Sequence, residues 1–220
     1  GNTSTKWQLR SGGDVVAGGQ GDLRALRDWI AALDDSKQYA VAVSCVKDDT
    51  YAHEIGHAFE SLSSATLHFV KSSATFAGVR NAYDEPQRLG VDRWLALLAI
   101  KARGESSAVI IDVGTACTID VLENGHHLGC YIFPGMALAR DALVANTDKI
   151  RFSGDPEPST SLGTDTAGCV LSGIWLTLLA SCQHVIDRFP NATVDLTGGS
   201  APELTALGLD AVSYTHLRAH

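Results

Sequence analysis

The strongest constraint on the fold is a glycine turn between two strands that occurs twice in this chain. In the second copy, a buried strand, a turn at Gly114 and two further strands are predicted across residues 107–134. The sequence GNTSTKWQL, which begins at Gly1, aligns with GTACTIDVL, which begins at Gly114, and matches Thr5 with Thr118. This weak internal repeat predicts two similar halves, and two facing glycine turns with hydroxyl side chains would form a two-sided phosphate clamp.

Strands and helices alternate along the rest of the chain, which predicts an α/β fold. Hydrophobic periodicity places helices at residues 21–33, 49–62, 91–103, 136–147 and 165–188, and strands at 39–46, 65–70 and near 194. A polar stretch at residues 104–107 separates the two parts of the pattern. We therefore expect an N-terminal half at residues 1–105, with its first strand truncated, and a C-terminal half at residues 106–220.

The composition limits the class of protein. Of 220 residues, 45% are apolar and 19% are charged, as in a globular domain with a real core. The net charge of -8 argues against non-specific nucleic-acid binding, which needs a basic surface. The five cysteines include no C-x-x-C pair, which favours reduced thiols in a cytosol. No apolar run approaches the roughly 18 to 20 residues of a membrane helix, so no membrane partner is expected.

The segment HEIGH, from His53 to His57, has the H-E-x-x-H spacing of zinc proteases. Its extension does not match the metzincin pattern, and Gly56 weakens a helix that would have to hold a metal rigidly. On a helix, Ile55 and Phe59 would form an apolar stripe against a sheet, and the two histidines would lie at the margin of solvent. A zinc protease is therefore the least favoured of three functional hypotheses.

Two glycine-containing loops are candidates for nucleotide binding. In IIDVGTACT, the N–H groups of Gly114 and Thr115 could reach a phosphate oxygen, and Asp112 could hold a cation that neutralises the phosphates. In LTGGSA, Gly198 and Gly199 would let a base or ribose approach the backbone. Each segment is also compatible with a plain hairpin or a strand-to-helix loop. The repeat of the first segment favours function.

Asp92 and Arg93 lie at the first turn of a predicted helix in YDEPQRLGVDRW. An Asp at that place is often an N-cap that accepts backbone N–H bonds. The functional alternative is a general base beside a cation that fixes an anionic substrate, because a hydroxyl nucleophile in phosphoryl transfer needs an aligned carboxylate.

Taken together, these motifs resemble type III pantothenate kinases of the actin/Hsp70/sugar-kinase superfamily. The resemblance runs from Gly1 to about Leu209 and rests on several motifs in a fixed order: GNTSTK, YDEPQRLGVDRW, DVGTACTID, GHHLGCYIFPGMAL, LGTDT and LTGGSA. It implies two RNase H-like halves, each a mixed sheet flanked by helices, with the active site in the cleft between them. It also implies ATP-dependent phosphorylation of the primary hydroxyl of pantothenate, the first step towards coenzyme A.

The resemblance assigns roles to particular positions. It implies that Asp92 is the catalytic proton acceptor and that Asp112 is the ligand of a monovalent cation. The implied pantothenate contacts are Tyr83, Gly90, Val91, Asp92, Arg93 and Thr166. The implied ATP contacts are Gly1, Asn2, Thr3, Ser4, Thr5, Lys6, Thr115, Gly198 and Gly199.

The same resemblance implies ATP with Mg²⁺, a potassium or ammonium ion, a homodimer and a cytoplasmic location. Some proteins with this resemblance are transcription-activating accessory factors, so a non-enzymatic regulator of the same fold is the alternative.

The chain departs from the family pattern at several places. The first phosphate loop of the family reads D-x-G-N-[ST], so its Asp would precede Gly1. Cys130 and Ser200 replace residues that are common in the family, and both replacements look tolerable. Residues 211–220 resemble no part of the family and are expected to be non-native.

Overall fold

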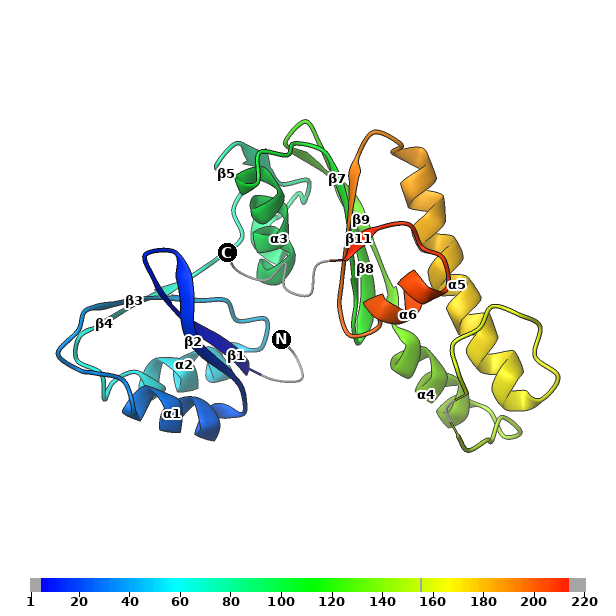
Figure 1. Ribbon diagram of the computed structural model, residues 1–220, viewed down its shortest axis with the longest axis horizontal. Helices are drawn as coiled ribbons and strands as arrows, with labels where there is room; N and C mark the ends of the chain where they lie inside the picture. The colour runs from blue at the N-terminus through cyan, green and yellow to red at the C-terminus, as the bar shows by residue number, and fades with distance from the viewer. Residues whose placement is uncertain (1–4, 155, 214–220) are drawn as a thin grey trace. The chain divides into compact units, whose positions relative to one another are not determined.

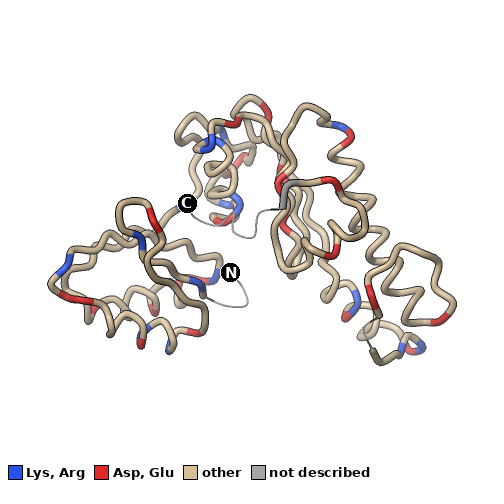
Figure 2. The backbone as a smooth tube through the Cα atoms, in the orientation of Figure 1, with Lys and Arg blue, Asp and Glu red and all other residues tan. Residues whose placement is uncertain are grey.

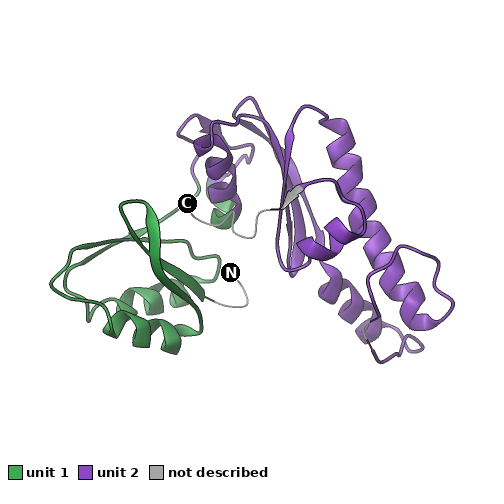
Figure 3. Ribbon diagram, in the orientation of Figure 1, with its two compact units in different colours: residues 1–72, 87–92 green, residues 73–86, 93–220 purple. Residues whose placement is uncertain are grey.

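A computed structural model describes residues 5–154 and 156–213 of the chain (Figure 1). The structure divides into two compact units (Figure 3). Unit 1 comprises residues 1–72 and 87–92, and unit 2 comprises residues 73–86 and 93–220. The bounds of these compact units do not test the predicted halves at residues 1–105 and 106–220, which stay a prediction.

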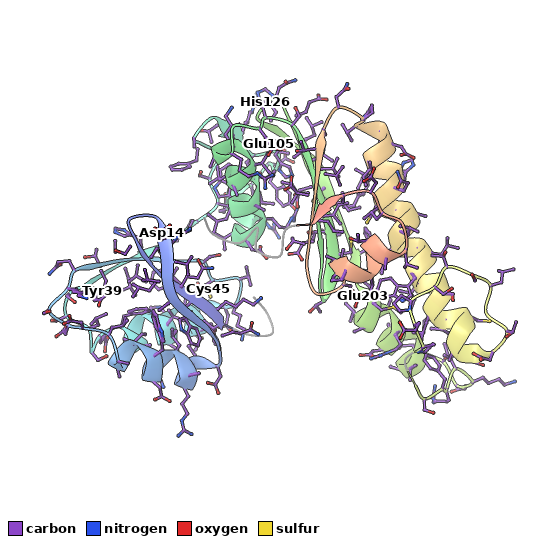
Figure 4. The ribbon with its side chains drawn as sticks, viewed as in Figure 1. Asp14, Tyr39, Cys45, Glu105, His126 and Glu203 are labelled. Carbon is purple, nitrogen blue, oxygen red and sulfur yellow. The ribbon has the colours of Figure 1, made fainter. Side chains whose placement is uncertain are left out.

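Unit 1 contains two small pairs of strands and two helices. Strands β1 (Thr5–Ser11) and β2 (Asp14–Gly21) form an antiparallel hairpin, and β3 (Tyr39–Val43) pairs in parallel with β4 (Ala65–Phe69). Figure 4 labels Asp14 and Tyr39, the first residues of β2 and β3. The helices are α1 (Leu23–Ala31) and α2 (Asp49–Ala58).

The core of unit 1 lies between these helices and the strands. Its buried members are Leu26, Ile30, Val43, Ile55, Ala58, Phe59 and Leu62. Both helices begin at an aspartate whose side chain accepts a backbone N–H: Asp22 for α1 and Asp48 for α2. The apolar stripe expected on the second helix is confirmed.

Unit 2 is built on one sheet of seven strands in the order β11-β10-β7-β8-β9-β6-β5. The strands are β5 (Thr75–Phe76), β6 (Val79–Arg80), β7 (Ala108–Val113), β8 (Ala116–Glu123), β9 (His126–Pro134), β10 (Thr193–Thr197) and β11 (Val212–Ser213). Strands β7, β8 and β9 are antiparallel, whereas β10 pairs in parallel with β7. The turn between β8 and β9 is made by Asn124 and Gly125, both at positive φ, as the Asn-Gly sequence predicts.

Helices α4 (Met136–Asn146), α5 (Thr166–Arg188) and α6 (Ala201–Ala206) lie on one side of this sheet, and α3 (Val91–Ala102) lies on the other (Figure 1). A short 3₁₀ helix, η1 (Pro86–Arg88), precedes α3. Val109, Ile111 and Val113 of β7 point into the core that α5 and α6 cover. The intervening β7 residues, Ala108 and Ile110, therefore face the side of α3.

By length and composition alone, helix α5 is long and apolar enough to cross a membrane. Of its most apolar stretch, 33% is buried inside the structure. The apolar stretch is thus longer than the sequence analysis expected. Its buried residues form a helical stripe in the core of unit 2: Leu171, Ile174, Trp175, Leu178, Cys182 and Val185. This stripe is the arrangement of a core helix in a folded domain.

Helix α3 is held at its two ends by buried ion pairs with the sheet. Near its start, Arg93 contacts Asp120 of β8, and just after its end, Arg103 contacts Asp195 of β10. Asp120 and Asp195 each pair in register with Ile110 of β7, so the three side chains lie in a row across the same face. Between these ends, Trp94, Leu97 and Ile100 form a fully buried stripe.

The predicted α/β fold is confirmed, and each predicted helix and strand has a counterpart in the structure. Strands β2, β5, β6 and β11 were not predicted from the sequence. The expectation of non-native sequence concerns residues 211–220, of which 214–220 lie outside the described residues.

The packing of α5 leads to a paired prediction on stability. Leu178 is 1% exposed in the core of unit 2, whereas Leu176 is 52% exposed on the same helix. Leu178→Ala should lower the free energy of unfolding by about 2–5 kcal/mol, because it removes buried methyl groups and leaves a cavity. Leu176→Ala should change it by about 0.5 kcal/mol or less. Urea unfolding of both variants would measure the difference, and equal losses would contradict this packing.

Candidate active site

The segment before α3 is folded by one buried amide. The side-chain NH₂ of Asn81 donates to the carbonyl oxygens of Ser73 (3.2 Å) and Pro86 (3.1 Å), and its oxygen accepts the N–H of Tyr83 (3.0 Å). Asn81 is 8% exposed, so these bonds satisfy a polar group that would be costly to bury alone. They fix the loop from which the Tyr83 side chain projects.

Arg93, in the first turn of α3, makes a bidentate contact with Asp120. Its Nε donates to Oδ2 at 2.8 Å and its NH2 group to Oδ1 at 2.5 Å. The two side chains are 11% and 3% exposed. Two parallel N–H···O bonds fix the orientation of the guanidinium plane as well as its position.

Tyr83, His127 and Cys130 surround this ion pair. The NH1 group of Arg93 donates to the Tyr83 hydroxyl at 3.1 Å, and that hydroxyl lies 3.4 Å from the sulfur of Cys130. The Nε2 atom of the buried His127 lies 2.9 Å from Oδ1 of Asp120, and its ring stacks on Tyr83 at 6.3 Å between centroids. Nδ1 of His127 accepts the N–H of Ala82 in a long contact of 3.5 Å, which assigns the ring proton to Nε2.

The charges in this network reinforce each other. Burial opposes ionisation of Asp120, but hydrogen bonds from Arg93 and His127 outweigh it and lower the pKa of that carboxyl. Burial also opposes the charge of Arg93, whereas the bonds to Asp120 and Tyr83 raise its pKa above the usual range. The hydrogen bond with Cys130 and partial burial raise the pKa of Tyr83, so this phenol is neutral at pH 7.

The other predicted substrate residues lie around the same helix start or further away. Gly90 directly precedes α3, and Val91 and Asp92 are its first two residues, so Asp92 lies inside the first turn and not at an N-cap. Thr166 is the exposed first residue of α5.

A second group of predicted residues is drawn together by glycines at the end of β7. Gly198, at a φ of 104°, lies so close to Val113 that a Cβ would collide with its backbone, and Ser200 N–H donates to the Val113 carbonyl at 3.0 Å. Gly135, which precedes α4, lies against Gly114 in the same way. The Gly114–Thr115 turn and the Gly198–Gly199 loop, predicted to bind ATP, are therefore both adjacent to the end of β7.

Details of this turn modify one expectation. The N–H of Gly114 donates to the Ala116 carbonyl at 3.0 Å, so it is used within the turn and is not directed at a phosphate. Thr115 and Gly199 are exposed beside it, and Asp112 is half-buried at the end of β7. The turn thus places the Thr115 hydroxyl and the Asp112 carboxylate within a few residues of each other.

The first predicted phosphate loop is described only in part. Gly1, Asn2, Thr3 and Ser4 lie outside the described residues. Thr5 and Lys6 begin β1 in unit 1, where the Thr5 hydroxyl lies 2.6 Å from the Tyr51 hydroxyl and Lys6 is exposed.

The HEIGH segment lies on α2. His53 and His57 are exposed, and Nδ1 of His57 lies 2.7 Å from Oε1 of Glu60. Within residues 5–154 and 156–213, no group of three or more His, Cys, Asp or Glu side chains is arranged to hold a metal ion.

Two residues of the network were missed by the sequence analysis. Asp120 and His127 belong to segments that were noted only as parts of motifs. A signal for Asp120 was present, because CTIDVL places a carboxylate inside an otherwise apolar strand and such a charge requires a partner. The identity of that partner, 27 residues earlier, could not be read from spacing.

Comparisons with known proteins agree on one family. The family model described as type III pantothenate kinase matches residues 1–188. A type III pantothenate kinase of Marinobacter nauticus is 31% identical over 217 residues, which cover 96% of this chain and 89% of that protein. One of a Marinomonas species is 33% identical over 239 residues, which cover 100% and 95%.

Solved structures support the fold. A protein of Campylobacter jejuni assigned to the Baf family of transcriptional activators has a TM-score of 0.57 at 17% identity, covering 91% of this chain and 84% of that one. A Sinorhizobium meliloti protein assigned as a 2-dehydro-3-deoxygalactonokinase has a TM-score of 0.53 at 12% identity, covering 96% and 88%. At these identities the likeness shows the fold alone.

The lowered pKa of Asp120 predicts how stability depends on pH. Because its folded pKa lies below the unfolded value of about 3.9, its carboxylate stabilises the fold above about pH 4, and this contribution is lost as pH falls through the folded pKa. Asp120→Asn should therefore cost about 3–5 kcal/mol at pH 7, where it breaks a buried pair, and progressively less below about pH 4.

Urea unfolding of the parent and of this variant at several pH values would measure the difference. The control is Asp141→Asn, which alters an exposed pair with Arg140 and should change stability by about 0.5 kcal/mol or less. A cost for Asp120→Asn that does not depend on pH would contradict the proposed role of its charge.

Proposed function

The chain belongs to the type III pantothenate kinase family, and we propose that the start of α3 and the glycine loops at the end of β7 carry its reaction. The reaction is transfer of a phosphoryl group from ATP to the primary hydroxyl of pantothenate in coenzyme A biosynthesis. The observation that carries the residue-level proposal is the buried Arg93–Asp120–Tyr83 network beside Asp92.

We assign Asp92 as the proton acceptor for the pantothenate hydroxyl. Phosphoryl transfer depends mainly on positioning and charge stabilisation, so a carboxylate within hydrogen-bond reach of the nucleophile is sufficient. Asp92 is half-buried on a helix that two ion pairs hold against the sheet. A helix anchored in this way supports a carboxylate in one orientation, because its backbone cannot shift without breaking buried contacts.

We assign Arg93 as the partner of the pantothenate carboxylate. A guanidinium presents planar donors that match a carboxylate, and the buried surroundings of Arg93 strengthen such a contact. Tyr83, whose hydroxyl is bound to Arg93, would contribute an aromatic face and a polar tip. Gly90, Val91 and Thr166 complete the proposed substrate set by family resemblance.

ATP is assigned to the loops of residues 1–6, to Thr115 and to Gly198–Gly199. The close approach of Gly198 to Val113 keeps side chains away from a surface on which a planar base could lie. Mg²⁺ would neutralise charge on the transferred phosphoryl group. Asp112 is an oxygen donor suited to a hard cation, and we assign it to the monovalent potassium or ammonium ion.

The alternative, a transcription-activating factor of the same fold, is not favoured. The structural likeness to a Baf family protein is at 17% identity and shows the fold alone. All of Asp92, Arg93, Asp112 and Thr115 are present in the chain. A regulator that had lost the reaction would be free to replace them.

The proposed activity is tested by a coupled kinase assay with pantothenate and ATP, with and without potassium. The chain should be assayed as it is and with an Asp-containing dipeptide before Gly1, which completes the phosphate-loop pattern. Asp92→Asn should lower kcat by at least a hundredfold while leaving pantothenate affinity within about threefold, because the amide keeps its shape but accepts no proton. Near-parental turnover of this variant would refute the assignment of the base.

We further propose a cytoplasmic homodimer. Support comes from exposed apolar side chains that are numerous on β9 and α4 of unit 2: Leu128, Tyr131, Ile132, Leu138 and Leu143. Neighbouring exposed apolar residues often mark a protein interface.

Sedimentation velocity at micromolar concentration should therefore give the mass of two chains. Ile132→Asp should shift the boundary towards one chain, since a charge would be buried in the interface. The control Val16→Asp alters an exposed apolar residue of unit 1 and should leave the mass unchanged. A monomeric parent would overturn this proposal.

A further inference from the structure

The contact between Arg93 and Asp120 suggests a role for Asp120, to which the family resemblance assigned none. We propose that Asp120, supported by His127, is a positioning residue that fixes the Arg93 guanidinium for the anionic group of the substrate. The inference rests on the proposed function, because it takes Arg93 as the contact of the pantothenate carboxylate.

The contact between Arg93 and Asp120 has the geometry of an orienting interaction. Asp120 accepts from Nε and NH2, which lie on one edge of the guanidinium. The NH1 group, on a different edge, donates to the Tyr83 hydroxyl. With two parallel bonds on one edge and a third bond to Tyr83, the guanidinium plane is held against rotation. A long side chain that is already held in place loses little rotamer freedom when it binds a ligand.

His127 connects Asp120 to the loop that carries Tyr83. Its side chain has no exposed surface, its Nε2 lies 2.9 Å from Oδ1 of Asp120, and its ring stacks on Tyr83. Nδ1 accepts the N–H of Ala82, one residue before Tyr83. The carboxylate, the imidazole and the tyrosine loop therefore hold each other, and Arg93 lies against both Asp120 and Tyr83.

The ion pair of Arg103 with Asp195, just after the end of α3, is the comparison for a pair that only anchors the helix. Asp195 is as deeply buried as Asp120, at 1% exposed, and Arg103 donates to its Oδ1 at 2.7 Å. Among the described residues, Oδ2 of Asp195 has no hydrogen-bond partner. Arg103 thus bonds one oxygen of its aspartate, whereas the pair at the start of the helix uses both oxygens and has His127 beside it.

The matched variants Asp120→Asn and Asp195→Asn separate positioning from anchoring. Each replaces a buried aspartate of the same sheet face by its amide, but only Asp120 contacts Arg93. Steady-state kinetics should be measured on the form of the chain that is active in the kinase assay. For Asp120→Asn we expect a KM for pantothenate at least tenfold higher, with kcat and the KM for ATP within threefold of the parent.

This pattern follows because the carboxylate of pantothenate does not react. Its contact with Arg93 is equally strong in the ground state and in the transition state, so weakening it raises KM and leaves kcat unchanged. Asp195→Asn should leave the KM for pantothenate within twofold. A merely structural role of Asp120 would lower the active fraction, which reduces kcat at constant KM.

A double-variant cycle adds an independent measurement. Arg93→Gln should raise the KM for pantothenate, and Asp120→Asn should have little further effect in that background, because Asp120 acts through Arg93. If Asp120→Asn does not fold, His127→Phe replaces it: the phenyl ring keeps the stack on Tyr83, removes the contact with Asp120, and should raise the KM threefold or more.

The inference is overturned if Asp120→Asn leaves the KM for pantothenate within twofold, if it lowers only kcat, or if its effect multiplies with that of Arg93→Gln. A KM raised equally by Asp195→Asn would also overturn it. A parent chain that phosphorylates no pantothenate in either form would instead contradict the proposed function, and the inference with it.

Discussion

The buried pair of Arg93 and Asp120 is the interaction on which the geometry of the site depends. A carboxylate in the middle of an apolar strand is tolerated only when donors replace its lost water, and here Arg93 supplies two, while Nε2 of His127 lies 2.9 Å from Oδ1. Since Arg93 lies in the first turn of α3, this requirement brings the start of the helix to β8. The position of Asp92, the next residue back, follows from the same contact.

The alternation of side chains along β7 and its neighbours explains how one sheet serves both a core and a site. One face of β7 enters the apolar core beneath α5, while the opposite face continues across the sheet as Asp195, Ile110 and Asp120. Helix α3 covers the polar residues on that second face, and Arg93 in the helix and Arg103 just after it pair with the two aspartates. At the end of β7 the strand leaves the core, and its last polar residue, Asp112, reaches the glycine loops.

Much of this arrangement could be predicted from the sequence, and the remainder could not for physical reasons. Periodicity located the helices and most strands, and the resemblance singled out Arg93. Strand β2 was not predicted because its end, AGGQG, has little of the apolar alternation that marks a half-buried strand. The pairing of Arg93 with Asp120 could not be predicted because it joins a helix to a strand 27 residues later, and the packing of a helix on a sheet is set by the tertiary fold and not by local sequence.

The two ion pairs of α3 have similar chemistry but opposite effects on their carboxylates. At Asp195, burial outweighs the bond from Arg103, and the nearby charge of Glu105 (Figure 4) adds to it, so the pKa of Asp195 is raised. At Asp120, the two bonds from Arg93 and the neighbouring His127 outweigh burial, and the pKa is lowered. Charged residues of both signs are spread over both units (Figure 2). The two ends differ in how the carboxylate is bonded. Arg93 bonds to both oxygens of Asp120 and stabilises its negative charge, whereas Arg103 bonds to one oxygen of Asp195. An arginine balanced in this way is held in one orientation, and that is the property a carboxylate contact requires.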